Sequence, residues 1–206
     1  MTKDPGTIFV VDDENSVRRA LTEMLDVFGY NVEAFETAEG LLQSLESRHV
    51  SCIVADVLMP GMNGIELVRE LSSRDTAIPV VVISGHADIA MAVAAIKAGA
   101  EDFIEKPIDD RKLIAAINRG LARRFEVQQQ QEAIHDLRAR FDRLTPREVQ
   151  VFDLVVTGQT STSISNVLKI SPRTVESYRT QIMEKMRAPN IAVLVRNAVR
   201  LGRLKP

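Results

Sequence analysis

Residues 52–60 read Cys-Ile-Val-Ala-Asp-Val-Leu-Met-Pro, a short apolar run that stops at Asp56 and is followed by a proline four residues later. An apolar run of this length, bounded by polar and turn residues, is typical of a β-strand. Similar runs lie before and after it, at residues 8–11, 32–35, 80–83 and 102–104. The sequence therefore predicts five strands.

Helical patterns separate these strands. Apolar side chains recur at helical spacing in five segments, which are residues 17–28, 41–45, 65–71, 89–96 and 113–121. Strands that alternate with helices form a parallel sheet with helices on both faces. Five such units in about 120 residues predict an α/β domain of the flavodoxin-like (βα)5 type, whose ligands bind at the carboxyl ends of the strands.

The stretch at residues 123–143 carries no strand signal and contains neither Gly nor Pro. Val127, Ile134 and Phe141 lie seven residues apart, and Gln130 interrupts this short heptad pattern. We interpret the stretch as a helical linker. Two alternatives stay open: it pairs with a second chain, or it packs on its own domain as a solvated helix.

From residue 144 onward the pattern is wholly helical. Thr145, Pro146 and Glu148 supply an N-cap, a Pro at the first helical position and a Glu at the third, which is a capping box. Gly158 ends that helix, and three more helices are expected at residues 160–169, from Ser171-Pro172 onward, and at 191–201. The predicted domains are an α/β domain at residues 6–124, a helical linker at 125–143 and an all-α, four-helix domain at 144–206.

The two predicted domains differ in charge. Residues 1–125 contain 13 Lys and Arg against 20 Asp and Glu, whereas residues 141–206 contain 11 against 5. The basic domain has the charge sign expected for a nucleic-acid partner. No apolar run reaches the roughly 18 residues that span a bilayer, so we expect a soluble, cytoplasmic protein. Cys52 is the single cysteine and lies in an apolar run, which predicts a buried, unreactive thiol.

Polar side chains follow four of the five predicted strands. Asp12 and Asp13 come after the first strand, Asp56 after the third, Ser84 at the end of the fourth and Lys106 at the end of the fifth. The carboxyl ends of parallel strands open onto one crevice, so we expect these side chains to meet there. Clustered carboxylates need a cation, and oxygen ligands with room for water suit Mg²⁺. The set suits phosphoryl transfer to a nucleophilic carboxylate.

The motifs of this half of the chain resemble the receiver domain of two-component response regulators. They occur in the family's order, as Val11-Asp12-Asp13-Glu14, Asp56-Val57-Leu58-Met59-Pro60-Gly61-Met62-Asn63-Gly64, Ser84-Gly85-His86 and Lys106-Pro107. The resemblance implies that a histidine kinase phosphorylates Asp56. It also implies that Asp12, Asp13, Asp56 and the backbone carbonyl of Leu58 bind Mg²⁺, and that Lys106-Pro107 is a cis peptide.

By the same resemblance, Ser84 and Phe103 form a switch pair next to Lys106. Ser84 would move toward the phosphate, and the ring of Phe103 would turn into the space that Ser84 leaves. The helix at residues 88–100 is unusually apolar for a helix with one solvent face. We interpret its surface as a contact made after switching, and in this family the face supports dimerisation. A fully packed helix is the alternative.

In the basic domain, Ile170 and Ser171 form the short turn between the second and third helices, as in a helix-turn-helix. The polar face of the third helix is where bases and phosphates would be read. The candidate DNA contacts are Arg173, Thr174, Glu176, Ser177 and Thr180, with Arg179 and Lys185 at phosphates. A plain solvated helix face is the alternative.

The segments 144–148 and 170–176, together with Gly158, resemble the NarL/LuxR type of DNA-binding domain, and the whole chain resembles FixJ-like regulators. The resemblance implies that the fourth helix pairs with its twin on DNA, through a stripe of Ile191, Leu194, Val195 and Ala198. Ser161-Thr162 stands where the family usually has Asn-Lys. A usual phosphate contact is therefore absent, and we expect a shallower salt dependence of DNA binding.

The resemblance thus implies a phosphorylation-dependent transcriptional regulator and not an enzyme, apart from its own phosphoryl transfer and slow self-dephosphorylation. The expected partners are a sensor histidine kinase, double-stranded promoter DNA, RNA polymerase and, once phosphorylated, a second copy of the chain. One alternative is a phosphatase with an Asp nucleophile, but such enzymes need a second Asp where Leu58 stands. Another is a receiver that binds protein or RNA, which the four-helix pattern disfavours.

Overall fold

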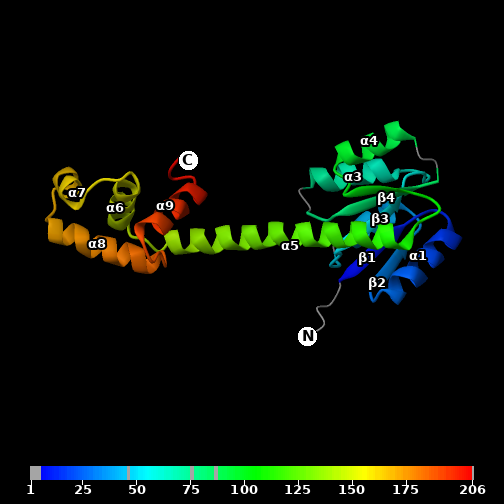
Figure 1. Cartoon of the computed structure of the whole chain (residues 1–206), viewed down its shortest axis with the longest axis horizontal. Coiled ribbons are helices and arrows are strands. Elements are labelled where there is room, and N and C mark those ends of the chain that lie inside the picture. Colours follow the sequence, from blue (N-terminus) through cyan, green and yellow to red (C-terminus); the bar gives the residue numbers. More distant parts are fainter. Residues whose placement is uncertain (1–5, 46, 75–76, 86–87, 206) are drawn as a thin grey trace. The chain divides into compact units, whose positions relative to one another are not determined.

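A computed structural model of the chain describes residues 6–45, 47–74, 77–85 and 88–205. The chain divides into two compact units, Met1–Val127 and Gln128–Pro206. Figure 1 shows both units, coloured along the sequence. The domain limits expected from the sequence, 6–124, 125–143 and 144–206, remain a prediction, and the two units are described separately below.

The first unit contains a five-stranded parallel sheet. Its strands are β1 (Thr7–Val11), β2 (Asn31–Phe35), β3 (Cys52–Asp56), β4 (Val80–Ser84) and β5 (Asp102–Glu105). They lie in the order β2-β1-β3-β4-β5, with every neighbouring pair parallel. This order confirms the predicted flavodoxin-like fold, in which β1 and β3 are adjacent. From β1 the chain adds β2 on one side and then β3, β4 and β5 on the other, so the strand order reverses at β1 and β3.

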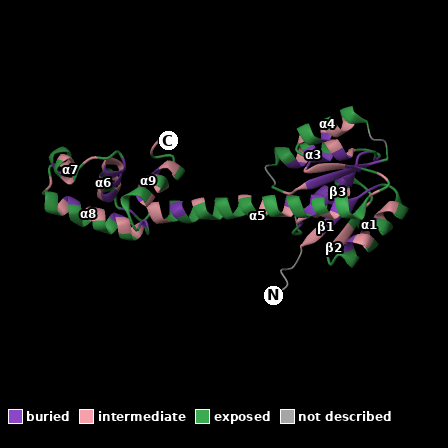
Figure 2. Ribbon diagram, in the orientation of Figure 1, coloured by how far each residue is buried: buried purple, intermediate pink, exposed green. Residues whose placement is uncertain are grey.

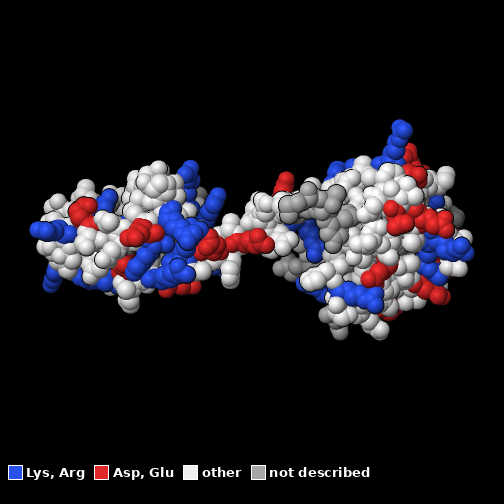
Figure 3. All heavy atoms as spheres, turned by 90° about the horizontal axis from the view of Figure 1, so that it is seen from below, with Lys and Arg blue, Asp and Glu red and all other residues white. Residues whose placement is uncertain are grey.

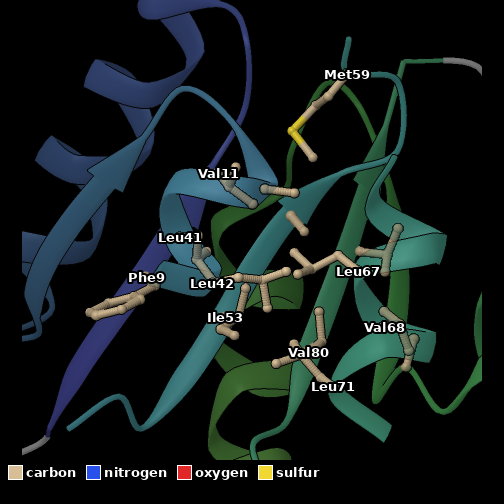
Figure 4. Close-up of a cluster of buried hydrophobic side chains, with 14 of the residues drawn as sticks. Phe9, Val11, Leu41, Leu42, Ile53, Met59, Leu67, Val68, Leu71 and Val80 are labelled. Carbon is tan, nitrogen blue, oxygen red and sulfur yellow. The ribbon is translucent and has the colours of Figure 1, made fainter. Parts of the chain in front are cut away.

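Helices cover both faces of this sheet (Figure 1). They are α1 (Asn15–Val27), α2 (Ala38–Ser44), α3 (Gly64–Ser73), α4 (Ile89–Ala98) and the first part of α5 (Asp110–Phe141). One core lies between the sheet and α2, α3 and α4, and the other between the sheet and α1 and α5. Figure 4 shows the first core, where side chains of β1 and β3 meet those of α2 and α3. The central strands are buried on both faces (Figure 2), which explains their uninterrupted apolar sequence.

The loop after β3 brings the start of α3 against the end of β3. Asn63 caps α3 and Glu66 completes a capping box, with both hydrogen bonds present. The backbone N–H of Gly64 donates to the carbonyl of Val57. A Cβ atom at Gly64 would lie 2.2 Å from the backbone oxygen of Asp56. Only glycine allows this approach, so the residue helps to shape the backbone at Asp56.

Replacing Gly64 with Ala is expected to lower the free energy of unfolding of the first unit by about 2 kcal/mol, because the added methyl group meets backbone atoms that cannot turn away. Tyr30 and Tyr178 are the two tyrosines, and the chain has no tryptophan. In a Tyr178→Phe background, tyrosine fluorescence during urea unfolding therefore reports the first unit. Gly85→Ala is the matched control, since its Cβ would meet nothing within 4 Å. Equal losses for the two variants would contradict the steric argument.

The second unit is helical. Its helices after α5 are α6 (Pro146–Val156), α7 (Ser161–Leu168), α8 (Pro172–Lys185) and α9 (Ile191–Arg200). The predicted capping box at Thr145 and Glu148 is confirmed, with both hydrogen bonds present. Thr160, Ser171 and Asn190 cap the three following helices through their side chains. All four helices contribute to one apolar core around Phe152.

Helix α5 differs from the sequence interpretation in one respect. The last helix of the first unit and the expected linker are one continuous helix, because no Gly or Pro stands after Gly120 to interrupt it. Arg124 holds its first part to the first unit, donating to the carbonyls of Val50 and Ser51. At its other end Leu137 is buried in the core of the second unit. This end therefore contacts its own domain, and pairing of the stretch with a second chain stays a prediction.

Candidate functional site

The polar side chains expected at the sheet edge do come together in the first unit. Asp12 follows β1, Asp56 ends β3, Ser84 ends β4 and Lys106 follows β5. Asp12 and Ser84 are fully buried, and Asp56 is 4% exposed. Two carboxylates are rarely buried so deeply unless a cation lies beside them, so this edge of the sheet is a candidate reactive site.

Lys106 supplies that positive charge. Its Nζ lies 2.8 Å from Oδ2 of Asp12 and 2.7 Å from Oδ1 of Asp56, so one ammonium group joins the two carboxylates. The peptide bond between Lys106 and Pro107 is cis, as the resemblance implied. The backbone N–H of Leu58 donates to the other Asp56 oxygen at 2.7 Å, which fixes the plane of this carboxylate.

The electrostatics of the site are a balance between burial and pairing. Burial raises the pKa of Asp56, while the hydrogen bond from Lys106 opposes the rise. Burial alone would lower the pKa of Lys106, but its hydrogen bonds to Asp12 and Asp56 outweigh burial and raise it. A carboxylate with little solvent and one shared ammonium is incompletely compensated, which favours a further cation at this site.

The donors present fit Mg²⁺. Asp12, Asp13 and Asp56 offer carboxylate oxygens, and this ion prefers oxygen ligands. The side chain of Asp13 is exposed at the same strand end, so it is free to turn toward an ion. Among the residues that the structure describes, no three His, Cys, Asp or Glu side chains already form a metal cluster. Ion binding would therefore require Asp13 and Lys106 to adjust.

Sequence reasoning missed Arg18 on α1. Its guanidinium donates to the backbone carbonyls of Asp12 at 2.7 Å and Asp13 at 2.9 Å. These bonds hold the loop that carries both acidic side chains. A basic residue near the N-terminus of a helix opposes the helix dipole, and this was the available signal that Arg18 has a local partner.

Ser84 and Phe103 lie on adjacent strands. Val82 is paired with Phe103, and Ser84 with Glu105. The Ser84 hydroxyl lies 3.7 Å from the sulfur of Met91 on α4, and Phe103 is partly buried against the same core as Met91. The pair is thus placed between the acidic site and α4. His86, part of the quoted motif, lies outside the described residues.

In the second unit, α7 and α8 form the expected helix-turn-helix. Val175 and Ile182 are buried in the core, while Arg173, Glu176, Ser177 and Thr180 are exposed on the other side of α8. Thr174 and Arg179 are partly buried. On the face of this unit seen in Figure 3, Lys and Arg side chains gather mainly at the end where α5 enters the unit, with Asp and Glu side chains beside them.

Comparisons with known proteins agree with this geometry. Residues 8–118 match the family model for the response regulator receiver domain, and residues 142–198 match that for bacterial regulatory proteins of the luxR family. The chain is 42% identical to the transcriptional regulatory protein FixJ of Rhizobium meliloti, over 95% of this chain and 96% of that protein. It is 38% identical to FixJ of Bradyrhizobium diazoefficiens, over 97% of each chain.

Two solved structures cover nearly the whole chain. The response regulator StyR is 40% identical, with a TM-score of 0.81 over 93% of this chain and 97% of that one. Full-length FixJ from B. japonicum is 37% identical, with a TM-score of 0.61 over 98% and 100%. The chain belongs to the FixJ-like response regulators. It is a phosphorylation-dependent transcriptional regulator with a receiver and a LuxR-type DNA-binding domain.

Two expectations for the DNA-binding domain meet contacts within the domain itself. The Nζ of Lys185 lies 2.7 Å from both carboxylate oxygens of Glu148, which is 1% exposed, and a phosphate contact by Lys185 stays a prediction. On α9, Leu194 and Ala198 are buried in the domain's own core, so the stripe expected to pair with a twin helix is not available as a whole. Ile191 is the exposed member of that stripe, at 44%.

No helix in the described part of the regulator is both long enough and apolar enough to cross a membrane.

Proposed function

We propose that this regulator accepts a phosphoryl group on Asp56 from a sensor histidine kinase. The observation that carries the proposal is the burial of Asp56 at the end of β3, with Lys106 Nζ 2.7 Å from one carboxylate oxygen and the Leu58 N–H holding the other. An oxygen of Asp56 would attack phosphorus, the bond from phosphorus to the kinase histidine would break, and an acyl phosphate would form.

Asp12, Asp13, Asp56 and the carbonyl of Leu58 would hold Mg²⁺. When bound, Mg²⁺ supplies positive charge to the phosphoryl oxygens. The ammonium of Lys106 lies within 3 Å of an Asp56 carboxylate oxygen. It would therefore need only a short movement, away from Asp12, to reach an oxygen of the new phosphate. Arg18 would keep the backbone of the Asp12–Asp13 loop in place during this change.

Ser84 and Phe103 would carry the signal from the phosphate to α4. Their positions between the acidic site and Met91 support this role. On α4, Ile89 is 82% exposed, and Val93 and Ile96 are about half exposed. This helix therefore exposes an apolar surface to solvent, and burying that surface against a partner would be favourable. We propose that this surface joins two phosphorylated receivers into a dimer, which would bind two DNA half-sites together.

The exposed face of α8 would contact promoter DNA. We propose Arg173, Glu176, Ser177 and Thr180 on the face that reads base edges, with Thr174 beside them, and Arg179 at a phosphate, while the Lys185 ammonium is paired with Glu148. The remaining proposed partners are RNA polymerase and the kinase, and a regulator of promoter DNA would act in the cytoplasm. Leu58 stands where a phosphatase would need a second acid, which supports a regulator without turnover of other substrates.

Phosphorylation of the full chain by acetyl phosphate tests the proposal. In the presence of Mg²⁺ the mass is expected to rise by one phosphoryl group, and the label should map to the peptide that contains Asp56. EDTA or the Asp56→Asn substitution should remove the label. Asp26→Asn, which changes an exposed carboxylate of α1 in the same way, should retain it. A label that persists in Asp56→Asn would show that Asp56 is not the acceptor.

A further inference from the structure

Three side chains link α7 to the start of α8. The hydroxyl of Ser161, at the first position of α7, donates to a carboxylate oxygen of Glu176. Nε of Arg179 lies 3.9 Å from the other carboxylate oxygen, and a terminal guanidinium nitrogen of Arg179 lies 3.4 Å from the Ser161 hydroxyl. We call these three residues the α7–α8 cluster.

The cluster places a carboxylate where DNA would bind. Glu176 lies near the N-terminal end of α8, the part of a recognition helix that reaches base edges, and its side chain is 62% exposed. Phosphates repel a carboxylate, so Glu176 weakens binding at this position unless it meets a donor. In the major groove, the donor that suits a Glu carboxylate is the N4 amino group of cytosine.

Glu176 keeps the capacity for that contact. A carboxylate has about four acceptor positions, and the hydroxyl of Ser161 uses one of them. Arg179 partly neutralises the negative charge without a close hydrogen bond, since its Nε is 3.9 Å away. Holding the side chain in one orientation also lowers the entropy that binding would cost. The cluster therefore presents an exposed, oriented acceptor on the DNA-facing side of α8.

We infer that Glu176 selects cytosine at one position of each half-site, with Ser161 and Arg179 as positioning residues. This inference rests on the proposed function, in that α8 must meet duplex DNA. It adds a base identity to a surface whose sequence preference was otherwise open. It also gives a role to Ser161, the residue next to Thr162, where the sequence resemblance implied that a phosphate-contacting lysine is absent.

Selection from a pool of duplexes with a randomised core tests the inference. The full chain, treated with Mg²⁺ and beryllofluoride, is incubated with the pool, and bound duplexes are sequenced. The wild type is expected to show one cytosine position per half-site that Glu176→Gln loses, with discrimination falling about tenfold and adenine gaining, because Gln suits adenine. Glu184→Gln is the matched control: it is exposed on the same helix, changes charge identically and should leave the preference unchanged.

Variants of Ser161 separate positioning from folding. Ser161→Ala is expected to weaken the cytosine preference severalfold, and Ser161→Thr, which restores the hydroxyl, should recover it. If Glu176→Gln selects the same sequences as the wild type, the inference is wrong while DNA binding stands. If the wild type binds no duplex of the pool at low salt, the proposed function itself fails, and the inference fails with it.

Discussion

Lys106→Met is expected to lower the free energy of unfolding of the receiver by about 3 kcal/mol in metal-free buffer. The substitution leaves Asp12 and Asp56, both nearly fully buried, without the ammonium that joins them. Breaking a buried ion pair by removing one partner costs about 3–5 kcal/mol, and the partial exposure of Lys106, at 24%, puts this case at the lower end. Urea unfolding followed by Tyr30 fluorescence, in the Tyr178→Phe background, measures the loss.

The same unfolding experiment is repeated with Mg²⁺ for the wild type and for Lys106→Met. An ion that binds only the folded chain adds about 2.7 kcal/mol at 100 times its dissociation constant. The ion should bind the variant more strongly than the wild type, because Lys106 no longer competes for the carboxylate oxygens. The difference between the two chains is therefore expected to narrow when Mg²⁺ is added. Lys112→Met, at an exposed position of α5, is the control. A difference that Mg²⁺ leaves unchanged would contradict a shared role of these carboxylates in binding the ion.

Lys185→Met is expected to destabilise the DNA-binding domain by a similar amount, about 3 kcal/mol near neutral pH. The Glu148 side chain is almost fully buried, and its carboxylate would lose both contacts from the Lys185 ammonium, keeping only its bonds at Thr145. Tyr178 fluorescence in a Tyr30→Phe background reports this domain. Lys205→Met, at an exposed position, removes the same charge and should cost little. A stable Lys185→Met chain that binds DNA less well would instead restore Lys185 as a phosphate contact.

The loss in Lys185→Met should depend on pH with a defined sign. Burial alone would raise the pKa of Glu148, but the bonds from Lys185 and Thr145 outweigh burial and lower it below the ordinary value of 4.5. In the wild type this contribution to stability is therefore present above pH 4.5 and is lost as the pH falls through the folded-state pKa. The two chains should converge in acid. A difference that grows as the pH falls would show that Glu148 is not the group involved.

The sequence predicted the sheet well because the central strands are marked twice. An uninterrupted apolar run gives the position of the strand, as at residues 52–55, and a polar residue at its carboxyl end gives its limit, as at Asp56. The same rule placed Asp12, Ser84 and Lys106 at one edge, since parallel strands end together. The capping box at Thr145 was equally predictable from the sequence, because its two hydrogen bonds join residues only three apart.

Sequence patterns could not predict contacts between side chains that lie far apart in the chain. From the sequence, Lys185 is only a basic residue on a DNA-facing helix, whereas its ion-pair partner Glu148 stands 37 residues earlier in another helix. Leu194 and Ala198 form an apolar stripe whether they face a twin chain or their own core, and the packing of α6 against α9 decides between the two. The continuity of α5 was missed because its apolar face changes from one core to another along its length.

Binding of duplex DNA with and without beryllofluoride tests the central claim most directly, namely that the chemical state of Asp56 controls the DNA-binding domain. The full chain is titrated into a fluorescent duplex taken from the selected pool, in Mg²⁺, and anisotropy gives the affinity. Beryllofluoride should raise the affinity of the wild type about a hundredfold through joint binding of two half-sites, and should leave Asp56→Asn unchanged. An equal rise in Asp56→Asn, or no rise in the wild type, would contradict that claim.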